Sequence, residues 1–150
     1  MEFKKAIYDE ETVKQLIELS YIWEKEDITW GLRHNTKDDL QEVCYIAIEN
    51  NKIIGYTFGK YGINDTHESF AKKGDKFFDI YELYVLPEYR NQGIGRKLFE
   101  LIENEVKDNA DFVVLGTATK DYQRILHFYL GHRMGILGCS TTEMKMSLGC

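Results

Sequence analysis

The chain is poor in residues that mark disulfide-rich and metal-binding proteins. It has 150 residues with a single proline, Pro87, and three cysteines, Cys44, Cys139 and Cys150. An odd number of widely spaced cysteines is typical of reduced thiols and not of a disulfide framework. The sequence also lacks C-x-x-C and H-E-x-x-H patterns, which are the spacings that common metal sites use. We therefore expect no bound metal.

Long apolar runs and runs of basic residues are missing as well. No stretch approaches the roughly 20 apolar residues that a membrane-spanning helix needs, and residues 1–10 lack the apolar core of a signal peptide. The formal net charge is −6, and no lysine or arginine run could follow a phosphate backbone. These absences predict a cytoplasmic protein that binds neither a membrane nor nucleic acid. The negative charge slightly favours a cationic partner.

The composition is that of one folded domain. Hydrophobic residues make up 43% of the chain and charged residues 29%, which is typical of a globular protein with a single core. No repeat, low-complexity tract or linker divides the sequence. We expect one domain over residues 1–150.

The first part of the chain predicts a strand, a helix and a hairpin. Residues 3–8 favour the strand, and the apolar positions that follow fall on one helical face that Asp9 is placed to cap. Residues 36–39 favour a second, short helix. Residues 43–48 and 53–58 predict a hairpin, because the asparagines between them tolerate the positive φ of a tight turn.

The middle of the chain holds its most informative segment, residues 79–98. The preceding residues 62–76 show neither the helical nor the strand spacing of apolar residues, so we expect a loop there. Residues 80–86 predict a strand that stops at Pro87, and Gly93 and Gly95 then lead into a helical pattern. Glycines let the backbone approach a ligand, and the first turn of a helix leaves amide N–H groups unpaired. A loop of this kind can hold a pyrophosphate.

The strand–loop–helix pattern has two interpretations. Gly93-Ile94-Gly95 begins a dinucleotide-binding G-x-G-x-x-G pattern, but Leu98 stands where its third glycine belongs. The spacing Arg90-x-x-Gly93-x-Gly95, after Glu82-Leu83-Tyr84-Val85-x-Pro87, instead resembles the acetyl-CoA signature of the GNAT superfamily of acyl-CoA-dependent N-acetyltransferases. We set the dinucleotide interpretation aside and follow the resemblance.

The resemblance implies an α/β fold with a mixed, mostly antiparallel central sheet, a splayed parallel strand pair, and helices on both faces. Residues 112–115 read as a buried strand after the helix, so the pair would be residues 79–86 and 112–118. A β-bulge near Tyr84 and Val85 would free backbone groups for the cofactor. The chain departs from the family pattern after Tyr129, so a shortened or abnormal final strand pair stays open.

Acetyl-CoA is the cosubstrate that the resemblance implies. Its pantetheine arm would pair with the backbone of the signature strand, where the Val85 N–H would stabilise charge on the thioester carbonyl. Its pyrophosphate would lie on the amides of the glycine loop. The expected cofactor-binding residues are Leu83, Tyr84, Val85, Arg90, Asn91, Gln92, Gly93, Ile94, Gly95, Arg96, Lys97 and Arg124.

A primary amine must lose a proton before it attacks a thioester, because its pKa is about 10.4. The resemblance places an acidic residue at Glu82, which we expect to act as general base, with Asp79 as the second candidate. A tyrosine in a Phe-Tyr pair often protonates the leaving thiolate in this family, and here that residue is Tyr129. The signature and its flanking strands contain no cysteine, which favours direct attack in a ternary complex.

The acceptor side is predicted from the segment 23–31, where two indoles and three carboxylates lie close in sequence. These groups could surround an ammonium ion. The expected substrate-binding residues are Trp23, Glu26, Trp30 and Asp79. The acceptor is then a small-molecule or peptide amine, and a homodimer is left open. The alternative function is a non-catalytic module that binds or senses acyl-CoA.

Overall fold

The structure, a computed structural model, describes residues 1–65, 72–117, 119–120, 128, 135–139 and 144–149. Strands are labelled β, α-helices α and short 3₁₀ helices η, in their order along the chain. They are β1 (Glu2–Lys5), α1 (Glu10–Glu26), η1 (Lys37–Asp39), β2 (Val43–Glu49), β3 (Lys52–Ile63), β4 (Lys76–Val85), η2 (Pro87–Tyr89), α2 (Ile94–Val106), β5 (Phe112–Thr117), β6 (Gly135–Cys139) and β7 (Met144–Gly149). No helix in this described part is both long and apolar enough to cross a membrane.

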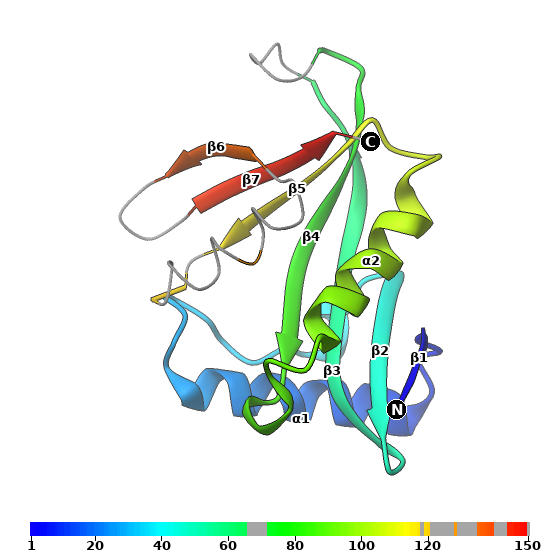
Figure 1. The fold of residues 1–150 in the computed structure, drawn as a ribbon, viewed down its shortest axis with the longest axis vertical. Helices are drawn as coiled ribbons and strands as arrows, with labels where there is room; N and C mark the ends of the chain where they lie inside the picture. Colours follow the sequence, from blue (N-terminus) through cyan, green and yellow to red (C-terminus); the bar gives the residue numbers. More distant parts are fainter. Residues whose placement is uncertain (66–71, 118, 121–127, 129–134, 140–143, 150) are drawn as a thin grey trace.

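The strands form one seven-stranded sheet in the order β1-β2-β3-β4-β5-β7-β6. Every neighbouring pair is antiparallel except β4 and β5, which are parallel. Figure 1 shows α2 crossing the front of the sheet with α1 behind it. Each helix buries an apolar face against the sheet: α1 packs on Tyr56, Phe58 and Tyr84, and α2 packs on Phe78 and Ile80. The predicted fold class is confirmed.

The parallel strands separate partway along their length, as the resemblance implied. Their pairing ends at Ile80 opposite Leu115. Beyond that point β4 continues to Val85 beside β3, and β5 continues to Thr117 beside β7. The two strands are therefore held apart by partners on opposite sides, and their carboxyl-terminal halves open a gap in the sheet.

The β-bulge lies earlier on β4 than predicted. Phe58 pairs with Glu82 while the next residue, Gly59, pairs with Ile80, so Tyr81 is the extra residue and the position near Tyr84 and Val85 is wrong. Gly59 explains the position, because a Cβ there would lie 2.2 Å from the Asp79 carbonyl oxygen. Only glycine permits so close an approach of two backbones. The bulge reverses the alternation of β4, so Glu82 faces α1 although Ile80 faces α2.

Local predictions in the first part of the chain are mostly confirmed. The Asp9 carboxylate caps α1 by accepting a hydrogen bond from the Thr12 N–H at 2.7 Å. Asn50 and Asn51 take φ values of 50° and 63° in the β2–β3 hairpin, as the turn requires. Two details differ: β1 is shorter than the predicted 3–8, and the short helix at 36–39 is a 3₁₀ turn.

One longer segment differs from the prediction, and the structure also describes the final strand pair that the sequence left open. The predicted loop 62–76 is strand at both ends, because β3 and β4 remain paired as far as Ile63 opposite Lys76. At the other end of the chain, β6 and β7 form an antiparallel pair, and β7 extends the sheet from β5. The final strand pair is therefore present.

Candidate active site

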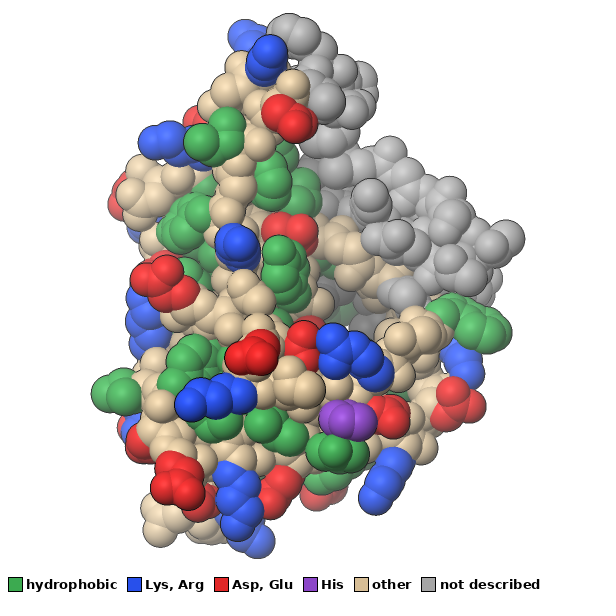
Figure 2. All heavy atoms as spheres, turned by 180° about the vertical axis from the view of Figure 1, so that it is seen from behind, with side chains coloured by type: hydrophobic (Ala, Val, Ile, Leu, Met, Phe, Trp, Pro, Cys, Tyr) green, Lys and Arg blue, Asp and Glu red, His purple; other side chains and the backbone are tan. Residues whose placement is uncertain are grey.

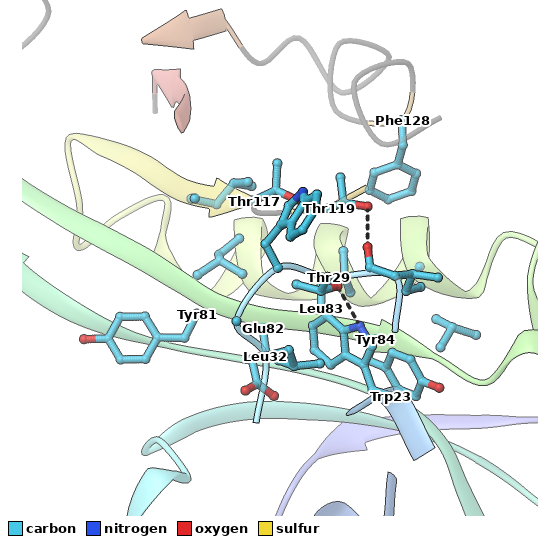
Figure 3. A pocket seen from close by; sticks show the side chains of 18 of the residues that line it. Trp23, Thr29, Leu32, Tyr81, Glu82, Leu83, Tyr84, Thr117, Thr119 and Phe128 are labelled. Carbon is cyan, nitrogen blue, oxygen red and sulfur yellow. Dashed lines mark hydrogen bonds between the residues drawn. The ribbon is translucent and has the colours of Figure 1, made fainter. Parts of the chain in front are cut away.

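A cavity of about 400 Å³ occupies the gap between the separated ends of β4 and β5. Figure 3 shows Tyr81 at one edge of the cavity and Phe128 at the other, with Thr119 directed toward the loop after α1, where its hydroxyl donates to the Ile28 carbonyl. Residues from both strands, the loop after α1 and the start of α2 line it. The lining residues are Trp23, Ile28, Thr29, Trp30, Gly31, Leu32, Ile80, Tyr81, Glu82, Leu83, Tyr84, Val85, Arg90, Gly95, Leu115, Gly116, Thr117, Thr119 and Phe128.

The backbone of β4 presents polar groups to this cavity. The Leu86 N–H donates to the Ile54 carbonyl at 2.9 Å, so Leu86 and, by alternation, Tyr84 direct their backbone groups toward β3. Leu83 and Val85 then direct theirs toward the gap. The Val85 carbonyl accepts a hydrogen bond from Arg90 Nε at 2.8 Å. The Val85 N–H and both backbone groups of Leu83 are left pointing toward the cavity.

The glycine loop brings a helix N-terminus to the same gap. Gly93 has φ of 82° and Asn91 has φ of 60°, so the chain turns sharply into α2. The first intrahelical bond here runs from the Lys97 N–H to the Gly93 carbonyl at 3.0 Å. The amides of Ile94, Gly95 and Arg96 therefore precede the helical ladder, at the positive end of the helix dipole. Such amides are suited to bind an anion.

Arg90 ties the glycine loop to α1 and β4. Its Nη2 lies 2.8 Å from Glu26 Oε1, and these side chains are 19% and 16% exposed. Tyr84 donates its hydroxyl to the same Glu26 oxygen, and the guanidinium lies 5.4 Å from the centre of the Tyr84 ring. Burial and the adjacent Glu26 carboxylate raise the pKa of Tyr84. Arg90 thus fixes the loop, and both it and Glu26 already have partners.

Glu82 is a largely buried carboxylate at the cavity wall. Its Oε2 accepts hydrogen bonds from the Tyr56 hydroxyl at 2.6 Å and from Asn35 Nδ2 at 2.8 Å. Both donors are rigid, since Tyr56 is 0% exposed and the Asn35 N–H is bound to Ser20 Oγ. Among the described residues, no donor reaches Oε1. Burial raises the pKa of Glu82, and the two hydrogen bonds oppose that rise.

Only some of the predicted acceptor-binding residues line the cavity. Trp23 and Trp30 line the cavity, whereas Glu26 and Asp79 do not. Trp23 stacks on Tyr84 with ring centroids 4.9 Å apart and donates to Thr29 Oγ1 at 3.1 Å.

Each carboxylate of the predicted ammonium cage already has a cationic or imidazole partner. Glu24 bonds His34 Nδ1, Glu26 bonds Arg90, and Asp27 bonds Lys120, all at 2.8–2.9 Å. Trp30 has a cation over its ring too, since Lys120 Nζ lies 4.6 Å from the ring centre. The segment therefore does not form an open cage.

Several residues at the site carry no local sequence signal. Asn35 and Tyr56 meet Glu82 only because the loop after α1 and the neighbouring strand β3 converge on it. The remaining predicted residues, Tyr129 and Arg124, lie outside the described residues. Phe128, next to Tyr129, lines the cavity and contacts Phe99 edge-to-face.

Comparisons with known proteins identify the family and the fold of the chain. The acetyltransferase (GNAT) family matches residues 8–135. The fold is similar to a GNAT acetyltransferase of Staphylococcus aureus Mu50, with 18% identity, TM-score 0.73 and 99% of both chains covered. Arabidopsis thaliana Naa50, in complex with the bisubstrate analogue CoA-Ac-MVNAL, gives 18% identity, TM-score 0.75 and full coverage of both chains.

A third solved structure is the PaiA N-acetyltransferase of Thermoplasma acidophilum in complex with coenzyme A, with 16% identity, TM-score 0.70 and full coverage of both chains. A comparison with curated proteins finds no match. At these identities the solved structures establish the shared fold, while the family match covers most of the chain. The chain belongs to the acetyltransferase (GNAT) family.

Proposed function

We propose that this protein transfers the acetyl group of acetyl-CoA to the primary amine of a small molecule or peptide. Family membership supports an acyl-CoA-dependent acetyltransferase. Solved structures of the same fold contain coenzyme A, or a bisubstrate analogue that joins coenzyme A to a peptide. The observation that carries the proposal is the cavity between β4 and β5, where a largely buried carboxylate and backbone amides directed into the gap line one space.

The cofactor side is suited to acetyl-CoA, which supplies the activated acyl group. The amides of Gly95 and Arg96 at the start of α2 would bind the pyrophosphate, with the helix dipole favouring its negative charge. Leu83 would pair with the pantetheine arm through its backbone. The Val85 N–H, directed into the gap, would stabilise negative charge on the carbonyl oxygen during attack.

The acceptor side is suited to remove a proton from an amine. Tyr56 and Asn35 occupy Oε2 of Glu82, so Oε1 is the oxygen that would accept the proton, directly or through a water. Burial raises the pKa of Glu82 above that of a free carboxyl group, which strengthens the carboxylate as a base. Asp79 is the second candidate, and Tyr129 is proposed to protonate the departing thiolate.

Turnover with a panel of amines tests the proposal. Purified protein is incubated with acetyl-CoA and each amine, released coenzyme A is measured through its thiol, and the product is identified by mass spectrometry. We expect amine-dependent release and an acetylated product. Binding of acetyl-CoA without turnover of any amine would indicate an acyl-CoA-binding module and contradict the proposal.

A further inference from the structure

We infer that the acceptor is an apolar monoamine: an amine with one positive charge whose neighbouring atoms are apolar, on a small molecule or at a peptide N-terminus. The inference rests on the proposed function and narrows its acceptor. It comes from the charges and the exposed aromatic rings around the acceptor end of the cavity. We define this end by four of the residues that line the cavity, Trp30, Leu32, Tyr81 and Glu82.

The described cavity wall offers one negative charge. Glu82 is the acidic residue among its lining residues, and Arg90 is the basic one. Arg90 is already bound to Glu26 and to the Val85 carbonyl. One carboxylate can pair with one ammonium group, whereas a second cationic group of a polyamine would find no acidic partner among the described lining residues.

Nearby carboxylates do not supply a binding position for a second cationic group. Asp27 is paired with Lys120 at 2.9 Å, and Glu26 is paired with Arg90 at 2.8 Å. Lys120 also lies over the ring of Trp30, at 4.6 Å, so the chain's own ammonium group occupies the cation-binding face that this indole offers. A second positive charge on the acceptor would meet repulsion there.

Lys120 is held in this place by its backbone. The Lys120 N–H donates to the Ile28 carbonyl at 2.7 Å, and Thr29 forms a β-bridge with Thr119. The loop after α1 is therefore joined to the chain beyond β5, next to the cavity. This attachment sets the backbone of Lys120 beside the loop that carries Trp30, and the ammonium group is then held by Asp27 and the Trp30 ring.

The same end of the cavity exposes apolar surface. Trp30 is 52% exposed and Tyr81 is 48% exposed, although large aromatic residues are usually covered. Leu32 lies beside Glu82 in the lining (Figure 3). An apolar group beside the reacting amine would bury these surfaces, which is favourable. Charge and apolar surface thus select the same acceptor chemistry.

Competing amines test the inference in the wild-type protein. The panel contains 2-phenylethylamine, an uncharged peptide amide that begins with leucine, spermidine, and an aminoglycoside, each assayed for kcat/KM. We expect one of the first two to exceed both polycations by about 10-fold or more. The comparison of 2-phenylethylamine with the leucine peptide amide shows whether the acceptor is a small amine or a peptide N-terminus. A preferred polycation would overturn the inference and leave the proposed function intact, whereas no turnover would overturn both.

Lys120→Gln tests the charge argument. Removing this cation should raise the ratio of kcat/KM for spermidine to that for 2-phenylethylamine by about 3- to 10-fold, because the repulsion is lost and Asp27 becomes available. Lys107→Gln, on an exposed lysine after α2, is the matched control and should leave the ratio unchanged. An unchanged ratio in Lys120→Gln, with the protein folded and acetyl-CoA still raising its melting temperature, would overturn the proposed role of Lys120.

Discussion

The two sides of the cavity are built in different ways. The cofactor side is made of backbone groups that follow one another in sequence, from Val85 on β4 through the turn at Gly93 to the first amides of α2. The acceptor side depends on one side chain, Glu82, which is held by Asn35 and Tyr56 from distant parts of the chain. One side is therefore encoded in a short motif, and the other is assembled by the fold.

The charges of the two sides differ as well. Amides at a helix N-terminus carry partial positive charge and suit an anionic cofactor. Glu82 carries the acidic charge of the described cavity wall and suits an amine. Over the face that carries α1, Figure 2 shows acidic and basic side chains interspersed, so the charge selectivity of the site comes from the cavity and not from that surface.

The largest expected effect is on the acceptor side. Glu82→Gln should lower kcat/KM at neutral pH by about 10²- to 10⁴-fold, because the amine loses its proton acceptor. Binding of acetyl-CoA should be unaffected, as measured by its thermal shift. Asp79→Asn is the comparison, since Asp79 does not line the cavity. If Asp79→Asn shows the loss and Glu82→Gln does not, the wrong carboxylate has been chosen.

A substitution on the cofactor side should instead abolish the binding of acetyl-CoA, which Glu82→Gln should leave intact. Gly93→Val should abolish the melting-temperature shift caused by acetyl-CoA, because a β-branched residue disfavours the positive φ that shapes the loop. Gly74→Val is a matched control. Gly74 also has positive φ and no atom within 4 Å of an added Cβ, but it lies outside the signature. Each substitution should cost about 1–3 kcal/mol of stability, and only Gly93→Val should lose the shift.

Tyr129→Phe tests the acid that protonates the thiolate. We expect kcat to fall by about 10- to 10³-fold, the scale of losing a positioned acid. The melting temperature and the affinity for acetyl-CoA should change little, because phenylalanine keeps the ring. A fully active variant would transfer the acid role to water or to another tyrosine, such as Tyr122.

The smallest effect should come from removing a hydrogen bond that holds Glu82. Tyr56→Phe removes a hydrogen bond to the ionised carboxylate, so the pKa of Glu82 should rise further. The acidic limb of the pH profile of kcat/KM should therefore move to higher pH. At pH values below that limb, kcat/KM should be about 3- to 30-fold lower than in the wild-type protein. Tyr45→Phe is the matched control, because Tyr45 bonds Glu105 at 2.7 Å away from the cavity. Equal profiles for the two variants would contradict a role for Tyr56 in tuning Glu82.

The sequence predicted the parts of the fold that depend on consecutive residues. Asp9 caps α1, Asn50 and Asn51 form the hairpin turn, and the helix begins directly after Gly93. Each of these features is set by local backbone preference or by a hydrogen bond within one turn. The separation of the parallel strands was likewise implied by the resemblance.

The sequence could not predict features that depend on distant contacts. The bulge at Tyr81 follows from the close approach of Gly59 to the Asp79 carbonyl, which no pattern within β4 reveals. The pairing of Asp27 with Lys120 joins residues from opposite ends of the chain. Nothing in the segment 23–31 indicates that partners from elsewhere would occupy its carboxylates.

The most direct measurement is the ratio of kcat/KM between the wild-type protein and Glu82→Gln, followed with one amine from neutral pH to the pKa of that amine. If Glu82 accepts the proton of the amine, the ratio should fall as pH rises, because more of the amine is already neutral and needs no base. A large ratio that stays constant over this range would contradict the role of Glu82 as general base.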